Sequence, residues 1–279
     1  MTMKITPLGA HIGAEVTGID LAKPVAEADR VALNQALVDH VALAIRDQEY
    51  GPEDFLAAAG VFGTPFPQNF TDFNLPDAPL INIVSSRHTD KKGKRILRGA
   101  SWHTDHTNRD CPPKCTVLYA VQLPSSGGDT GVCNMRAAYE ALPDAVKARL
   151  ADAKTCNVHE GRAADRESPK GRELEAKEKS VPIFHPIVRT HPESGRKALW
   201  FHPVKTDYVT GYSPEETRVL LRDLLASAVK PEFVYRHKWR KGDMLIWDNR
   251  QAMHQAYHDY DPAEHRMMYR LLLEGDRPF

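Results

Sequence analysis

The sequence predicts a mainly β fold with flanking helices, in which the core is a closed or double-sheet β structure. Two observations favour it over an alternating array of strands and helices: the strand-like runs are many and short, and the connections between them are long. Apolar and β-branched residues bounded by Gly, Pro, Asp or Asn mark each run. The runs are Val41–Arg46, Leu80–Val84, Thr116–Val121, Lys197–Phe201, Phe233–His237, Asp243–Trp247 and Met267–Leu273.

Four further segments carry apolar residues at helical spacing. They are Glu27–His40, Pro52–Val61, Met135–Asp152 and Ser213–Val229. The last has the clearest start, because Ser213, Pro214 and Glu216 supply an N-cap, a proline at the first helical position and a capping-box glutamate. We predict that this helix is scaffold and takes no part in chemistry.

Two charge-rich stretches, Ser85–Ser101 and His159–Lys179, form no apolar face and predict loops. The first runs directly into the segment around His103, so it must pass close to any site built there. Loops of this kind often border or cover a site. Within the first loop, Arg95 and Arg98 are expected to be free surface charges, although they are also placed to supplement recognition of an acid.

The composition predicts one domain spanning residues 1–279, because 279 residues with 42% hydrophobic side chains suffice for a sizeable core. Lys+Arg and Asp+Glu both number 37, which predicts no general attraction to nucleic acid or membrane. The sequence contains no run of about 18 apolar residues, so we predict no membrane span. Four cysteines without a secretory leader predict free thiols in a reducing cytoplasm. These are Cys111, Cys115, Cys133 and Cys156.

His103 and Asp105, together with the distant His254, supply two imidazoles and one carboxylate. Along an extended strand the side chains of residues i and i+2 point to one face, so His103 and Asp105 can hold one ion. Two imidazoles and a carboxylate form the donor set of non-haem iron(II) oxygenases, which leaves positions open for further ligands. Alone the signal is weak, because an ordinary strand with two polar residues gives the same pattern.

Further motifs surround these three residues. Gly-Gly-Asp-Thr occupies positions 127–130, Trp-Asp-Asn-Arg occupies 247–250, and Arg266 and Arg270 lie 12 and 16 residues beyond His254. With these motifs the chain resembles the taurine dioxygenase and 2,4-dichlorophenoxyacetate dioxygenase (TauD/TfdA-like) family of iron(II)/2-oxoglutarate-dependent oxygenases. The resemblance runs from Gly13–Asp20 to Gly275–Phe279. It implies a double-stranded β-helix, the cupin-like jelly roll, as the core.

The resemblance also implies the ligands. Fe(II) would be held by His103, Asp105 and His254, with 2-oxoglutarate and O2 as cosubstrates. Thr130 and Arg266 match the positions that bind the distal carboxylate of 2-oxoglutarate. An arginine suits that task because its guanidinium forks onto a carboxylate and keeps its charge.

Arg270 matches the arginine that holds the substrate anion in taurine enzymes. Other pocket positions depart from that pattern. Where taurine enzymes have a histidine and a tyrosine, this chain has Gln68 and Thr71, and where they have an asparagine it has Gly99. We therefore predict a substrate pocket lined by Arg270, Gln68, Thr71 and Gly99, in which taurine itself binds poorly.

Several neighbours of the motifs are expected to support the site without binding the metal. Trp102 and Trp247 should pack around it, and Asn249 and Arg250 should orient His254 through hydrogen bonds. Four further histidines lie near the motifs, and none has a partner at the spacing of a metal ligand: His106, His202, His258 and His265. Of these we expect His202 to touch the substrate.

The interpretation that follows is an oxidoreductase that hydroxylates an aliphatic carbon of a small anionic sulfonate or carboxylate, releasing succinate and CO2. Halogenating relatives replace the carboxylate ligand by a small residue, so Asp105 favours hydroxylation. Two alternatives remain open. A redox-silent metallohydrolase would use His103, Asp105 and His254 but would have no use for Arg266 and Thr130. A non-catalytic jelly-roll binding protein would have little reason to retain the three ligands and both arginines. The sequence leaves open whether the protein is a homo-oligomer.

Overall fold

Eight strands form the large sheet of the computed structural model, which describes residues 2–68, 71–90, 92–158 and 181–279. They are β1 (Lys4–Pro7), β2 (Ala14–Thr17), β3 (Ala42–Ile45), β4 (Asn74–Leu75), β5 (Ala78–Ser85), β6 (Cys115–Gln122), β14 (Met244–Asp248) and β16 (Met267–Leu273). Their order is β1-β2-β3-β14-β6-β16-β5-β4. Every pair is antiparallel except β2–β3.

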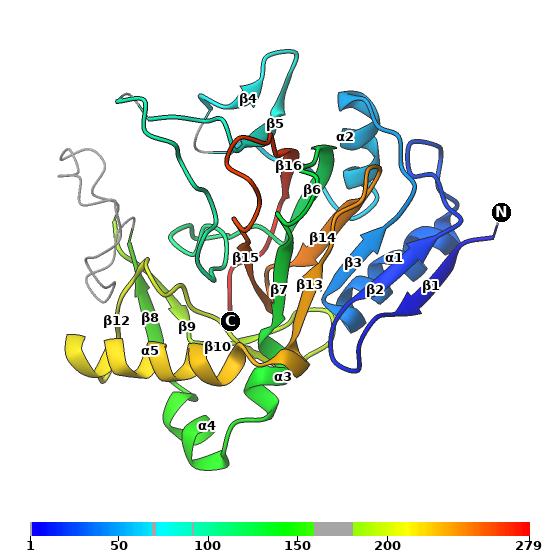
Figure 1. Cartoon of the computed structure of the whole chain (residues 1–279). Coiled ribbons are helices and arrows are strands. Elements are labelled where there is room, and N and C mark those ends of the chain that lie inside the picture. Colours follow the sequence, from blue (N-terminus) through cyan, green and yellow to red (C-terminus); the bar gives the residue numbers. More distant parts are fainter. Residues whose placement is uncertain (1, 69–70, 91, 159–180) are drawn as a thin grey trace.

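A small sheet packs against the large one (Figure 1). Its strands are β13 (Val234–His237), β7 (Thr130–Asn134) and β15 (Ala252–Ala256), in that order. Val132 of the small sheet shares a buried cluster with Leu118, Leu245 and Met268 of the large sheet. This cluster fills the space between the sheets, so the predicted double-sheet core is confirmed.

Helices cover the two outer faces. α1 (Glu27–His40) and α2 (Pro52–Gly60) pack against the large sheet through a second buried cluster. α3 (Met135–Glu140), α4 (Asp144–Leu150) and α5 (Pro214–Ala228) lie on the side of the small sheet, with a 3-10 helix, η2 (Pro231–Phe233). The five strands that complete the fold form a three-stranded sheet, β12-β8-β9, and a pair, β10-β11. They are β8 (Lys154–Asn157), β9 (Ile183–Pro186), β10 (Val188–Thr190), β11 (Lys197–Leu199) and β12 (Thr206–Val209).

Most predicted elements are confirmed, and one helix is not. The predicted capping box is present, since the Ser213 N–H donates to Glu216 Oε2 (2.8 Å) and the Glu216 N–H donates to Ser213 Oγ (3.2 Å). The single helix Met135–Asp152 is wrong. It is divided into α3 and α4 because Pro143, the N-cap of α4, has no N–H to continue the first helix.

The two predicted loops have different outcomes. From Ser86 to Ser101 the described residues form no helix or strand beyond an isolated bridge between Thr89 and Arg95, which confirms a loop. The second, His159–Lys179, lies outside the described residues. In the part of the chain that the structure describes, no helix is both long and apolar enough to cross a membrane.

Candidate metal centre

His103 and His254 come together because their backbones pair across the edge of the small sheet. The His103 N–H donates to the His254 carbonyl (3.0 Å) and the reverse bond is 2.8 Å. The predicted strand through Asp105 is wrong, since pairing stops at His103 and the chain turns, with His106 at a φ of 50°. The turn takes Asp105 away from the small sheet toward the large sheet, where it accepts a hydrogen bond from Thr116 of β6 (2.6 Å).

The three predicted ligands converge. Donor atoms of His103, Asp105 and His254 lie within 4.8 Å of one another, and no other such group occurs among the described residues. His103 Nε2 is 3.9 Å from Asp105 Oδ1, and His254 Nε2 is 3.7 Å from Asp105 Oδ2. These separations exceed hydrogen-bond length. The three groups therefore surround a common point without bonding to one another.

The protonation states also suit a cation. His103 Nδ1 lies 2.7 Å from the Ser101 carbonyl, which can only accept, so Nδ1 carries the proton and Nε2 keeps its lone pair. Burial lowers the pKa of both His103 and His254, which keeps the imidazoles neutral. Burial alone would raise the pKa of Asp105, but Arg270 and the imidazoles bring it well below its usual value. Two neutral nitrogen donors and one carboxylate are a donor set that fits iron(II).

A chain of hydrogen bonds supports Asp105 from behind. Thr116 Oγ1, which donates to Asp105, accepts from Asn249 Nδ2 (2.9 Å), and Asn249 Oδ1 accepts from Trp247 Nε1 (3.0 Å). The Trp247 ring also packs on His254, with ring centroids 4.5 Å apart, which confirms its expected packing role. Sequence reasoning missed Thr116, because a threonine inside an apolar strand gives no local signal of a partner 11 residues away.

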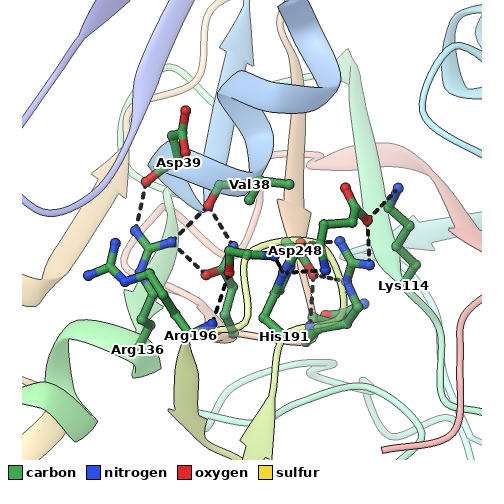
Figure 2. Close-up of polar contacts among 12 residues, drawn as sticks. Val38, Asp39, Lys114, Arg136, His191, Arg196 and Asp248 are labelled. Carbon is green, nitrogen blue, oxygen red and sulfur yellow. Dashed lines mark hydrogen bonds and ion pairs between the residues drawn. The ribbon is translucent and has the colours of Figure 1, made fainter. Parts of the chain in front are cut away.

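The expectation that Asn249 and Arg250 orient His254 is wrong. Asn249 acts on Asp105 through Thr116, as described above. Arg250 instead binds both carboxylate oxygens of Asp248, at 2.8 and 2.7 Å, and reaches Glu193 (2.6 Å). His191 completes this group at 2.9 Å from Asp248 (Figure 2). The described residues offer no hydrogen-bond partner to His254 Nδ1.

Thr130 and Arg266 lie in contact, as predicted from their motifs. Arg266 Nε donates to the Gly128 carbonyl (2.8 Å) and Nη2 lies 3.4 Å from Thr130 Oγ1. Gly128 is required here: its φ is +72° and a Cβ would lie 3.0 Å from the Arg266 side chain. Arg266 is 4% exposed, and burial lowers its pKa to about 10. No carboxylate among the described residues forms an ion pair with it.

Thr130 and His254 face the same space. On paired strands, directly opposite residues and residues two positions along a strand share a face. His254 is opposite Val132, and Thr130 is opposite Ala256. Since Val132 points into the cluster between the sheets, Thr130 and His254 point into that interior too.

Arg270 reaches the metal ligands directly. Its Nη2 is 2.7 Å from Asp105 Oδ2, and its Nη1 donates to Gln68 Oε1 (2.6 Å). Gln68 in turn donates to the Arg270 carbonyl (3.2 Å), so the two predicted pocket residues form one unit. Gly99, at a φ of +70°, lies against His103, where a Cβ would be 3.5 Å from the imidazole. Thr71 is exposed, beside residues outside the described part.

His202 is buried near the ligands, with its ring centroid 5.8 Å from that of His103. Its Nδ1 accepts from the backbone N–H groups of Val204 (3.0 Å) and Lys205 (3.1 Å). Because Nδ1 is engaged as an acceptor, Nε2 carries the proton of the neutral ring. Burial lowers the pKa of His202 well below its usual value, which favours that neutral form.

The chain is similar to known proteins over nearly its whole length. Residues 4–272 match the family model described as "Taurine catabolism dioxygenase TauD, TfdA family". A (S)-phenoxypropionate/alpha-ketoglutarate-dioxygenase of Sphingobium herbicidovorans is 35% identical, over 98% of this chain and 95% of its own. An alkylsulfatase of Acinetobacter baylyi is 32% identical, over 98% of this chain and 86% of its own. The crystal structure of AAD-2 with Mn(II) and N-oxalylglycine is 33% identical, with a TM-score of 0.84 and coverage of 100% and 99%.

Proposed function

The chain belongs to the TauD, TfdA family of iron(II)- and 2-oxoglutarate-dependent dioxygenases, and from that premise we propose which residues carry its reaction and on what compound. As a member it is an oxidoreductase that uses iron(II), 2-oxoglutarate and O2. We propose that it hydroxylates an aliphatic carbon of a small sulfonate or carboxylate, with succinate and CO2 as coproducts. The observation that carries this proposal is the convergence of the half-buried His103 with the buried Asp105 and His254, with Arg270 in contact with Asp105 and Arg266 in contact with Thr130.

The three convergent ligands would hold the iron, and Thr116 would fix the orientation of Asp105. When bound, iron(II) supplies the activation of O2 by which 2-oxoglutarate is decarboxylated and a C–H bond is oxidised. The buried site keeps both imidazoles neutral and available as donors. The protein thus contributes a fixed set of three donors directed at one point.

Arg266 and Thr130 would bind the distal carboxylate of 2-oxoglutarate. A buried guanidinium without a carboxylate partner is costly, because desolvation disfavours the charge. Arg266 is in this position among the described residues, with a backbone carbonyl and a hydroxyl as its neighbours. A carboxylate of the cosubstrate would supply the missing charge and accept from both Arg266 and Thr130.

Arg270 would bind the anionic group of the primary substrate, with Gln68 holding its guanidinium. The relatives act on compounds of this kind, as the names alkylsulfatase and (S)-phenoxypropionate/alpha-ketoglutarate-dioxygenase state. Gly99 leaves room beside His103, and Thr71 would border the entrance. Gln68 and Gly99 provide no charged contact for an amine, so we expect taurine to be a poor substrate.

Three further expectations remain proposals. We propose that residues 1–279 act as one domain, which is supported by the buried cluster between the large and small sheets and by the two clusters that join helices to each sheet. We propose a cytoplasmic location, which the four free thiols support. The partners would be small molecules and not nucleic acid, given the balanced charge, and a homo-oligomer also stays a proposal.

The test is succinate release by enzyme loaded with iron(II) under anaerobic conditions and then exposed to O2 with a panel of anions. The panel should pair alkyl sulfonates, alkanoates and sulfate esters with neutral alcohols of the same length. We expect release to depend on 2-oxoglutarate and to be stimulated by anions. Stimulation by the neutral compounds alone would contradict the proposed substrate class, and efficient turnover of taurine would contradict the proposed lining of the substrate pocket.

A further inference from the structure

Arg98, in the loop that leads to His103, is not the free surface charge that its sequence context favoured. Its guanidinium lies 4.2 Å over the Phe73 ring, and its Nη1 donates to Asn82 Oδ1 (3.1 Å). Asn82 is 1% exposed, on β5 of the large sheet. Arg98 is therefore half-buried and held at a defined place above the sheet.

That place is beside Arg270. Asn82 and Arg270 are directly paired between β5 and β16, neighbouring strands near the edge of the large sheet (Figure 1). Directly opposite residues on paired strands project to the same face, with Cβ atoms about 5 Å apart. The Asn82 side chain holds Arg98, so the guanidinium groups of Arg98 and Arg270 are brought to one region of that face. Burial, and then the charge of Arg270, lower the pKa of Arg98 to about 10.

The protein offers these two arginines little negative charge of its own. Arg270 contacts Asp105, which is a metal ligand, and Gln68, which is neutral. Arg98 forms no ion pair with the described residues, and the exposed Asp72 acts on it from beyond ion-pair distance. Among the described residues only its Nη1 donates a hydrogen bond, which leaves Nε and Nη2 as candidate donors to an anionic ligand.

The local charge then sets the charge of the ligand. Arg98, Arg266 and Arg270 with a divalent ion carry five positive charges, whereas Asp105 and 2-oxoglutarate carry three negative charges. Asp72, which acts on Arg98, and Lys205, which acts on His103, add one charge of each sign. Asp129, which acts on Arg266, is paired with Arg236. Two positive charges therefore remain among these groups. A buried site of this kind favours the ligand that neutralises it, because uncompensated charge in a low-dielectric space is costly.

We propose that Arg98 and Arg270 together bind the anionic part of the primary substrate, and that this substrate carries two negative charges. The inference rests on the proposed function, because it assigns a second arginine to the same substrate site. Arg98 is the residue that determines specificity, since it adds a second guanidinium to the one on Arg270. The two charges belong either to two groups, as in a sulfoalkanoate, which lies within the proposed substrate class, or to one group, as in an alkyl phosphate, which would extend that class.

The experiment is calorimetric binding at pH 8 to full-length enzyme loaded with Mn(II) and N-oxalylglycine, so that no turnover is needed. Hexyl phosphate is doubly charged at this pH and hexyl sulfate singly charged, with equal chain length. A third probe, 6-sulfohexanoate, separates the two charges. We expect at least one dianion to bind the wild type at least about tenfold more tightly than hexyl sulfate, and the better one identifies how the charges are arranged.

The variants assign the effect to Arg98. Arg98→Gln should weaken the preferred dianion by at least about 30-fold, as expected for loss of one partner of a buried charged pair, and hexyl sulfate by less than about threefold. Arg98→Lys should retain part of the preference, because it keeps the charge without the fork. Arg87→Gln, which removes an exposed arginine of the same loop, should change neither affinity.

Equal weakening of both probes in Arg98→Gln, or a wild type that prefers hexyl sulfate, would overturn the proposal. Should Arg98→Gln fail to fold, the pH dependence of binding to the wild type still tests whether the site prefers the doubly charged phosphate. Hexyl phosphate should then bind more weakly as the pH falls through about 6, where it takes up its second proton, whereas hexyl sulfate should not. Failure to bind Mn(II) and N-oxalylglycine at all would refute the proposed function instead.

Discussion

Asp105 and Asp248 are both buried aspartates beside a histidine and an arginine, yet their oxygens are engaged very differently. Asp248 Oδ1 accepts from the Arg250 side chain (2.8 Å) and backbone (3.0 Å), and Oδ2 accepts from Arg250 (2.7 Å) and His191 (2.9 Å). Asp105 Oδ2 accepts from Thr116 and Arg270, whereas Oδ1 has no hydrogen-bond partner among the described residues and lies 3.9 Å from His103 Nε2. One carboxylate is saturated and the other is partly open.

A lowered pKa of a buried aspartate therefore does not by itself mark a binding site. For both aspartates, burial would raise the pKa and neighbouring positive groups reverse the shift. What differs is the geometry of the donors. Asp248 is closed by short contacts to Arg250 and His191, and Arg250 also pairs with Glu193, which contacts Lys114. Figure 2 shows Asp248 with His191 and Lys114 in this group, which therefore serves stability. The Asp105 group leaves donor atoms directed at a shared space, which is the property of a binding site.

The largest effect should separate the two aspartates by activity. Asp105→Asn should lower succinate release by more than about 100-fold, beyond the 10- to 100-fold typical of losing a residue that only supports a ligand. Its melting temperature without metal should fall less than that of Asp248→Asn, because Asp105 Oδ1 has no hydrogen-bond partner among the described residues, whereas both oxygens of Asp248 are bonded. Iron titration by calorimetry and a thermal melt are the two measurements.

His254→Ala provides a second test of the same set, since it removes a neutral nitrogen and not a charge. It should abolish turnover as well. Retained turnover in either variant would contradict the assignment of the ligands. A melting temperature that falls equally in Asp105→Asn and Asp248→Asn would contradict the division between an open and a saturated group.

Asp248→Asn should have the next largest effect, on stability. Breaking a buried charged pair by removing one partner costs about 3–5 kcal/mol, here because Arg250 would be left without its bidentate acceptor. That loss corresponds to a fall in melting temperature on the order of 10 °C. Iron affinity of the folded fraction should be unchanged. Reversible urea unfolding measures the first effect and calorimetry the second.

The pH dependence checks the sign of this contribution. The folded protein holds the pKa of Asp248 below the unfolded value of about 3.9, so its stabilisation is present above that value. It is lost progressively as the pH falls below about 5. The difference in unfolding free energy between wild type and Asp248→Asn should therefore narrow between about pH 5 and pH 3. A difference that grows on acidification would show that Asp248 is not the stabilising acid.

Arg250 and Arg266 extend the comparison to cations. The carboxylates around Arg250 raise its pKa despite burial, whereas the pKa of Arg266, which has no such partner, falls to about 10. Arg266→Ala should weaken 2-oxoglutarate by about 2–5 kcal/mol, or roughly 30- to several-thousand-fold. Iron affinity should change far less. The absorbance of the anaerobic iron complex reports the cosubstrate, and Arg222→Ala, an exposed arginine on α5, is the control.

The metal ligands were predictable from sequence because their signal is local or fixed in spacing. His103 and Asp105 are two residues apart, and Arg266 and Arg270 follow His254 at set intervals. The partners of Asp248 carry no such signal. His191 lies 57 residues away from Asp248, on a segment with no motif. Sequence reasoning therefore predicted His254, and not Asp248, as the partner of Arg250. The contact was set by how the two segments pack, which spacing does not encode.

The fold shows the same division. Strands with strong apolar runs, such as Met267–Leu273, were predicted at their observed bounds. Thr130–Asn134 was missed because Gly131 and Asn134 weaken its pattern, although its pairing with β15 places Thr130 near His254. The turn at His106 was missed for a different reason. It follows from the hydrogen bond between Asp105 and Thr116, a tertiary contact that overrides the local preference for an extended strand.

The smallest effect should come from Thr116, which connects Asp105 to Asn249. Thr116→Val keeps the shape but removes the donor to Asp105 and the acceptor of Asn249 Nδ2. Because Asp105 would then be held by Arg270 alone, iron affinity should fall about 10- to 100-fold. Calorimetric titration of iron(II), or of Mn(II) in its place, measures the loss.

Thr107→Val is the matched control for that variant. Thr107 is also fully buried and near Asp105, but its hydroxyl has no hydrogen-bond partner among the described residues. Replacing that hydroxyl should therefore leave iron affinity within about threefold, since no hydrogen bond is lost. Equal losses in the two variants would mean that iron affinity responds to packing near Asp105. A loss confined to Thr116→Val would show that a hydrogen bond from the large sheet holds the open carboxylate ready for the metal.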